Sequence, residues 1–107
     1  MDVYNLTKRA LDISSLRGKV IANNIANVNT KEYKRYYVNF KESLDNEANK
    51  IQIKTDSSTS MREDGNNVDI DSEMVDQAAN SLMYNALVSD INTRLTVQSY
   101  VINEGKR

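Results

Sequence analysis

The chain has 107 residues, 39% of them hydrophobic and 27% charged, with a formal net charge of −1 at pH 7. This length predicts one domain at most, because one core of this size is typical and a second has no room. The absence of cysteine and histidine excludes disulfides and thiolate zinc sites. It also removes the commonest catalytic acid/base and the commonest transition-metal ligands. No apolar run approaches the roughly 18 residues of a membrane span, and the N-terminus lacks the order of a cleaved signal peptide.

Charge is distributed unevenly along the chain. Residues 1–54 carry ten Lys and Arg against six Asp and Glu, whereas residues 55–107 carry four against nine. The two halves therefore attract each other, either within one molecule or between neighbouring molecules. Ordinary solvated faces would give the same totals, since exposed ion pairs contribute little free energy.

The first predicted element is a helix over residues 3–28. Its positions on one face recur at steps of three and four residues, the spacing of a helix, with Arg17 as the one interruption. They are Val3, Leu6, Ala10, Ile13, Val20, Asn24 and Asn27. A second ridge of small side chains recurs every four residues and comprises Ser14, Gly18, Ala22 and Ala26. We expect another backbone to approach closely there, because a helical glycine otherwise costs about 1 kcal/mol relative to alanine. A merely tolerated surface glycine is the alternative.

The pattern breaks after Asn27, where short polar side chains favour a helix end and a turn. Tyr36, Val38 and Phe40 then alternate with polar neighbours, which predicts an extended segment, and residues 51–53 repeat this briefly. Few apolar side chains occur in residues 41–67. We therefore expect this middle to be mobile or lightly ordered.

A second long helix is predicted to begin near Asp71 and to end at Gly105, because acidic residues at its start suit the helix dipole. One face of it comprises Val75, Ala78, Ala79, Leu82 and Ala86. A further stripe comprises Met74, Tyr84, Val88, Ile91, Leu95 and Ile102. A hairpin of the two helices leaves apolar surface uncovered, which indicates partner helices, and a homodimeric bundle would cover the same surface.

The residue spacing argues against two kinds of binding site. An EF-hand loop with Gly65 at its glycine position would need acidic ligands where Ser60 and Arg62 stand, so the calcium match fails. Basic residues beside tyrosines occur only over residues 31–41. With a sequence pI near 5.4, a solvated loop or a protein contact explains that cluster better than nucleic-acid binding does.

Two blocks of residues resemble a known family. The first is Asn24-Ile25-Ala26-Asn27, followed by Thr30 and Tyr33-Lys34. It resembles the N-terminal signature N-I-A-N-x-x-T-x-G-Y-K of flagellar axial proteins, which include rod and hook proteins. The second is Asp64-Gly65-Asn66-Asn67-Val68-Asp69-Ile70-Asp71, followed by Glu73-Met74 and Ala79-Asn80-Ser81-Leu82-Met83-Tyr84. It resembles the proximal-rod members. Glu32 stands where the family has glycine, so a left-handed turn there is either absent or strained.

The resemblance implies a mainly α fold in which two long amphipathic terminal helices pack as an antiparallel coiled-coil hairpin, with a polar, partly extended middle. Residues 1–35 and 68–107 would form the inner assembly domain and residues 36–67 a small extended, flexible segment. The implied function is a structural subunit of the bacterial flagellar rod, which polymerises into the torque-transmitting shaft. We expect no enzymatic activity and no cofactor. A soluble helical dimer acting as adaptor or regulator is the alternative.

The resemblance also implies a place and partners. The chain would lie in the flagellar basal body, outside the cytoplasm, after type III export without a cleaved signal. Its partners would be other rod proteins, the adaptor that joins rod to membrane ring, the export gate and further copies of itself, with no nucleic acid and no small-molecule substrate. The expected assembly residues are Leu6, Ile13, Gly18, Val20, Asn24, Asn27, Thr30, Tyr33, Lys34, Gly65, Asn66, Val68, Asp69, Leu82, Tyr84, Val88, Ile91, Leu95 and Ile102.

Overall fold

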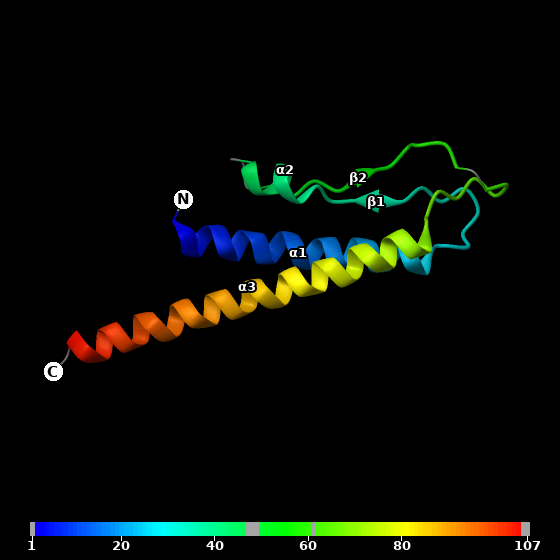
Figure 1. The fold of residues 1–107 in the computed structure, drawn as a ribbon. Helices are drawn as coiled ribbons and strands as arrows, with labels where there is room; N and C mark the ends of the chain where they lie inside the picture. The colour runs from blue at the N-terminus through cyan, green and yellow to red at the C-terminus, as the bar shows by residue number, and fades with distance from the viewer. Residues whose placement is uncertain (1, 47–49, 61, 106–107) are drawn as a thin grey trace.

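A computed structural model describes residues 2–46, 50–60 and 62–105. Figure 1 shows two long helices lying side by side, with a short helix and a two-stranded sheet along one of them. The elements are α1 (Val3–Ala26), β1 (Tyr36–Tyr37), α2 (Phe40–Asp45), β2 (Lys54–Thr55) and α3 (Ile70–Gly105). The molecule is elongated, with extents of 70 × 27 × 14 Å. The prediction of a mainly helical chain with one long helix near each end is confirmed.

Local chemistry explains where the helices start. The Asp2 side chain accepts the Asn5 amide N–H at 2.7 Å and caps α1. The Asp69 side chain accepts the N–H groups of Asp71 and Ser72 at the start of α3, at 3.1 and 3.2 Å. Helix α1 ends at Ala26, slightly before the predicted end, because the chain turns at Asn27.

The apolar core lies between α1 and the middle segment. Ile13, Val20 and Val38 are buried and form its centre. Four partly buried side chains pack around them: Leu16, Phe40, Leu44 and Ile51. Three of these four lie outside α1, and two of them, Leu44 and Ile51, come from residues 41–67, where apolar side chains are few.

The middle segment also differs from its predicted secondary structure. The extended pattern expected to run through Phe40 stops earlier, because the Asn39 side chain accepts the Glu42 N–H at 2.9 Å and starts α2 at Phe40. The sheet is antiparallel, with Tyr36 opposite Thr55 and Tyr37 opposite Lys54. The second strand therefore follows Ile51 and Ile53 instead of containing them.

Helices α1 and α3 run in opposite directions, and the two buried residues of α3 bond to α1 through polar side chains. Ser14 of α1 contacts Asn80, and Asn24, nearer the end of α1, contacts Glu73 at the start of α3. Glu73 and Asn80 are the buried residues of α3. The apolar face predicted on this helix points elsewhere, since Val75 is 68% exposed and Leu82 is 73% exposed. None of the helices described is long and apolar enough to span a bilayer.

Candidate assembly site

The two sequence blocks meet at the end of the molecule where α1 ends and α3 begins (Figure 1). Asn66 is fully buried there. Its side-chain N–H groups donate to the carbonyl oxygens of Asn27 and Thr30, both at 2.8 Å, and its side-chain oxygen accepts the Val68 N–H at 2.8 Å. One amide therefore closes the turn after α1 onto the segment that leads into α3.

Asn24 joins three elements at the same end and is also fully buried. Its side-chain N–H groups donate to the Tyr36 carbonyl at 2.7 Å and to the Glu73 carboxylate at 3.2 Å. Its oxygen accepts the Tyr36 N–H and the Tyr33 hydroxyl, both at 3.0 Å. Burial raises the pKa of the Tyr33 hydroxyl above its ordinary value. Asn24 thus bonds to the other long helix, whereas the Asn27 side chain bonds locally, to the Asn23 carbonyl at 2.8 Å.

A buried ion pair links the two halves of the chain. The Arg35 guanidinium donates to the Glu73 carboxylate at 2.6 Å and to Asp56 at 3.2 Å, and Glu73 is only 1% exposed. Burial lowers the pKa of Arg35, but the neighbouring carboxylates of Glu73 and then Asp56 together raise it by more, so the net shift is upward. The pKa of Asp56 is lowered, chiefly by the N–H of Ser58 and also by Arg35. Part of the attraction between the basic and acidic halves is therefore intramolecular.

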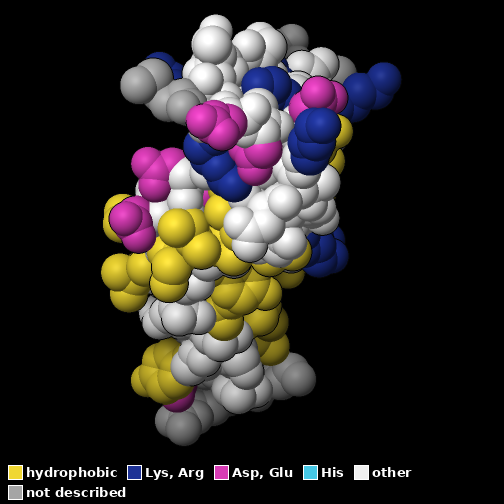
Figure 2. All heavy atoms as spheres, turned by 90° about the vertical axis from the view of Figure 1, so that its right-hand side faces the viewer, with side chains coloured by type: hydrophobic (Ala, Val, Ile, Leu, Met, Phe, Trp, Pro, Cys, Tyr) yellow, Lys and Arg dark blue, Asp and Glu magenta, His cyan; other side chains and the backbone are white. Residues whose placement is uncertain are grey.

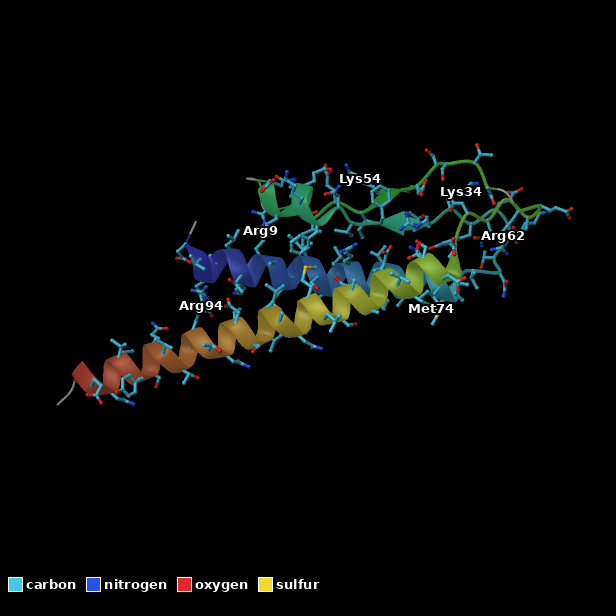
Figure 3. All side chains as sticks on the ribbon, in the orientation of Figure 1. Arg9, Lys34, Lys54, Arg62, Met74 and Arg94 are labelled. Carbon is cyan, nitrogen blue, oxygen red and sulfur yellow. The ribbon has the colours of Figure 1, made fainter. Side chains whose placement is uncertain are left out.

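Glu32 adopts the left-handed turn that the family glycine would adopt. Its φ is 61°, in the region that favours glycine. Its N–H donates to the Asp64 carbonyl at 2.7 Å. Gly65, with φ 75°, lies against it, and the Gly65 carbonyl accepts the Lys34 ammonium at 2.7 Å. The turn is thus present, and bonds from both sequence blocks hold it in spite of the glutamate. Figure 3 shows Lys34 and Arg62 at this end of the molecule.

Gly18 lies where α1 and α3 approach each other closely. A Cβ at this position would lie 3.2 Å from the Asn80 side-chain nitrogen. The Gln77 side chain donates to the Gly18 carbonyl at 3.1 Å, and Asn80 exchanges hydrogen bonds with Ser14 at 2.9 and 3.0 Å. The close approach expected at the small-residue ridge therefore occurs to α3 of the same chain.

The side of α3 that faces away from α1 is exposed and largely apolar. We call it the outer α3 face. It comprises Val75, Ala79, Leu82, Ala86, Ser89 and Tyr100, all exposed. Figure 2 shows hydrophobic side chains gathered on the lower part of the molecule, the side on which α3 lies, and charged side chains on the upper part. A contiguous exposed apolar surface of this kind indicates a partner.

The C-terminal part of α3 extends past the start of α1 (Figure 1). Tyr4 of α1 lines an open groove with residues 93–95 and 97–98 of α3. Beyond that groove, Tyr100, Val101 and Ile102 are all more than half exposed. This overhang has apolar side chains on several sides, because consecutive helical residues point about 100° apart.

The expected assembly residues fall into separate groups. Nine gather where the sequence blocks meet: Asn24, Asn27, Thr30, Tyr33, Lys34, Gly65, Asn66, Val68 and Asp69. Ile13 and Val20 belong to the core, and Gly18 lies between the long helices. Val88 and Ile91 are half-buried, and the exposed ones are Leu6, Leu82, Tyr84, Leu95 and Ile102.

Sequence reasoning missed the polar residues that join the elements. In the sequence, Arg35 belongs to a basic cluster, Glu73 is one of the charges at a helix start, and Asn80 is one residue of the second sequence block. A polar residue inside an apolar helical pattern was the available signal, since buried polar groups need partners. No cluster able to hold a metal ion is found among the residues described.

Comparison with known proteins identifies the family. Residues 7–34, most of α1 and the turn after it, match the family described as flagella basal body rod protein. The flagellar basal body rod protein FlgB of Bacillus subtilis (strain 168) is 36% identical over an alignment 123 positions long, which covers 97% of this chain and 95% of that protein. The chain belongs to the FlgB family of flagellar basal body rod proteins. FlgB of Borrelia hermsii is 34% identical, covering 75% of this chain and 80% of that protein.

A third relative is FlgB of Borreliella burgdorferi, which is 30% identical over 79% of this chain and 84% of its own length. The resemblance inferred from the two sequence blocks is thereby confirmed. Membership of the FlgB family makes the chain a structural protein of the flagellar rod in the basal body.

Proposed function

We propose that this chain is a proximal-rod subunit that polymerises through α1 and α3 into the torque-transmitting shaft. The observation that carries the proposal is the outer α3 face, which stays apolar and exposed because α3 meets α1 through polar residues. Burying that face between subunits would contribute roughly 25 cal/mol per Å² of apolar surface. A shaft under torque needs such contacts repeated along its length.

The arrangement also supports a division of roles. In the proposed rod, residues 1–35 and 68–107 form the inner, antiparallel coiled-coil layer and residues 36–67 lie outside it. The middle segment and α3 cover different sides of α1, with Val38 of the middle segment on Ile13 and Val20, and Asn80 of α3 on Ser14. The middle can therefore remain in place while α3 meets neighbouring subunits.

We further propose that the partners are other rod proteins, the adaptor between rod and membrane ring, and the type III export gate, which would pass the chain out without a cleaved signal. The family relationship supports these partners. Among the described residues, the exposed apolar surface supports self-association directly, whereas the other partners are supported by the family relationship alone.

The test replaces the chromosomal copy with a tagged Leu82→Asp variant. Leu82 is 73% exposed, so a charge there is tolerated in the isolated chain and becomes costly only where a partner covers it. We expect the variant to be made and secreted but to yield no rods and no swimming. The control is Asn85→Asp, which adds the same charge at an exposed polar position of the same helix and should swim normally.

Two outcomes would contradict the proposal. Normal swimming of the Leu82→Asp strain would show that this face meets solvent in the rod. Absence of the tagged wild-type chain from purified basal bodies, together with a stable soluble dimer, would instead favour the helical adaptor.

A further inference from the structure

A cleft lies between α1, β1 and the start of α3. Its volume is about 280 Å³, and its lining includes Arg17 of α1, Val38 just after β1, and Asp76 of α3. Arg17 is the residue that interrupts the apolar positions of α1. Arg17 and Asp76 are both half-buried, and neither forms a hydrogen bond or an ion pair with any described residue. The cleft therefore contains one free donor group and one free acceptor group, of opposite charge.

The main chain that borders the cleft is unpaired as well. Along an extended strand, successive N–H and C=O groups point to alternate edges. The Arg35 carbonyl bonds on the β2 side, whereas the Tyr36 N–H and carbonyl bond to the Asn24 amide on the α1 side, at 3.0 and 2.7 Å. By this alternation the N–H and carbonyl of Val38 also lie on the α1 side, where no described residue bonds to them, although Val38 is only 4% exposed. Buried main-chain groups normally have partners, so a partner is missing at Val38.

We propose that the cleft binds an extended segment of a second copy of this chain, residues 57–60, through main-chain hydrogen bonds at Val38. This inference rests on the proposed function and deepens it, because it names a contact between subunits that lies outside the long-helix surfaces. Addition of a strand to a free sheet edge is a common mode of recognition between proteins. Asn24 shows the same pairing within the chain, since its one amide both donates to and accepts from the main chain of Tyr36.

The charges in the cleft favour a neutral occupant. A carboxylate would satisfy Arg17 but would approach Asp76, and an ammonium group would satisfy Asp76 but would approach Arg17. A main-chain amide is neutral and carries both a donor and an acceptor, so a short stretch of main chain can bond to both side chains and still pair with the strand edge. Arg35 does not change this balance, because Glu73 and Asp56 already pair with it.

Residues 57–60 have the matching features. They follow β2 and lie in neither helix nor strand, and the first three are exposed. The Ser58 N–H and carbonyl bond to side chains of the same chain, while the main-chain groups of Ser57 and Thr59 bond to no described residue. One edge of the segment is thus free, and its side chains are small and uncharged. Figure 1 shows the chain after β2 running away from α2, which flanks the cleft, so we expect the segment to enter the cleft of another copy.

The consequence is an open array. A contact between the cleft of one copy and the segment of another is heterologous, so the second copy still offers its own cleft to a third. The same contact can therefore be repeated along a rod, where it would join the middle segments of adjacent subunits.

Cysteine cross-linking tests the contact, since the chain has no cysteine of its own. Tyr37 lines the cleft next to Val38. Ser58 lies between the two residues with free main-chain groups, so thiols at 37 and 58 come close whichever way the segment runs. We expect the double variant Tyr37→Cys/Ser58→Cys, treated in purified basal bodies with a short thiol-to-thiol cross-linker, to give a ladder of covalent multimers. Each single variant should give none, and co-expression of the two single variants should give dimers only.

The matched control is Tyr37→Cys/Lys50→Cys, which should give no ladder. Lys50 is exposed and belongs to the same middle segment. It is as far along the chain from Lys54, the residue opposite Tyr37 in the sheet, as Ser58 is, so links within one copy are equally available to both pairs.

Proline substitution tests whether the main chain makes the contact. Ser57→Pro/Thr59→Pro removes both free N–H groups and still favours an extended chain, whereas Ser57→Ala/Thr59→Ala keeps them. In the otherwise wild-type chain we expect the proline variant to lower the yield of rods about fivefold, the factor that one hydrogen bond contributes to an equilibrium. The alanine variant should assemble normally.

The inference is overturned if the double cysteine variant is incorporated but gives no ladder, or if Tyr37→Cys alone gives dimers. It is equally overturned if the proline and alanine variants assemble alike, and this comparison decides by itself where the double cysteine variant is not incorporated. Absence of the tagged wild-type chain from basal bodies would instead refute the proposed function, so the two failures are distinguishable.

Discussion

The two covered sides of α1 differ in chemistry. Toward the middle segment, α1 presents Ile13 and Val20, which pack on Val38. Toward α3 it presents Ser14 and the backbone of Gly18, which meet side chains that donate and accept hydrogen bonds. Apolar burial contributes free energy without direction, whereas a hydrogen bond adds only about 1 kcal/mol net but requires one geometry. The first side therefore stabilises the fold, and the second sets the register of the long helices.

The largest loss of stability is expected from a substitution on the side of α1 that packs on the middle segment. Ile13 is fully buried, and Ile13→Ala removes its contacts and leaves a cavity, for which we expect a loss of about 4 kcal/mol in the free energy of unfolding. Urea denaturation followed by circular dichroism measures it. The control is Leu82→Ala on the outer α3 face, which should change the monomer by less than about 0.5 kcal/mol. Equal losses of stability for Ile13→Ala and Leu82→Ala would show that Ile13 does not lie in the core.

On the polar side, the buried carboxylate should matter most. Glu73→Ala leaves Arg35 without its shorter ion pair, and we expect a loss of about 3 kcal/mol, the low end for such pairs, because Arg35 keeps Asp56. Asp71→Ala removes an exposed acid from the same helical turn and should cost under about 1 kcal/mol. The same denaturation experiment compares them. If Glu73→Ala and Asp71→Ala were equally stable, the Arg35–Glu73 ion pair would not help to fix the register of the long helices.

The close approach of α1 and α3 at Gly18 predicts a smaller loss in the free energy of unfolding when this glycine is replaced. Gly18→Leu places a side chain where even a Cβ would lie 3.2 Å from Asn80, and we expect a cost of about 2 kcal/mol from overpacking. Asn80 has little freedom to move, since it is bonded to Ser14 in both directions. Ala22→Leu adds similar bulk at an exposed position of α1 and serves as the control. If both variants unfold at the same urea concentration as the wild type, the helices are not in close contact at Gly18.

The smallest expected change is a gain in the free energy of unfolding, at Glu32. Glu32 has φ 61°, and left-handed backbone costs an L residue about 1–2 kcal/mol. Glu32→Gly should therefore raise the free energy of unfolding by about 1 kcal/mol at most, because the greater freedom of unfolded glycine offsets part of the gain. Gly65→Ala, at φ 75°, should lower it by a similar amount. A destabilised Glu32→Gly chain would show that the glutamate side chain is needed at this turn.

Much of the secondary structure followed from local patterns in the sequence. The spacing of residues such as Leu6 and Ile13 predicted the first helix, and the acidic start near Asp71 predicted the second, because both signals lie within a few turns of the residues they describe. The two sequence blocks also identified the family. The sequence contained the outer α3 face as well, since Val75 and Leu82 lie on the face that the periodicity had marked.

Only the tertiary structure decided which faces meet. Periodicity shows that a helix has an apolar side, but not whether that side is covered by its own chain or by another. Here α3 turns Glu73 and Asn80 toward α1 because Arg35, Asn24 and Ser14 satisfy them there, as buried polar groups require. The apolar side of α1 is covered by the middle segment, whose short helix at Phe40 depends on the Asn39 cap and on burial against Ile13 and Val20. These choices rest on contacts between residues 20 to 66 positions apart, which no local pattern contains.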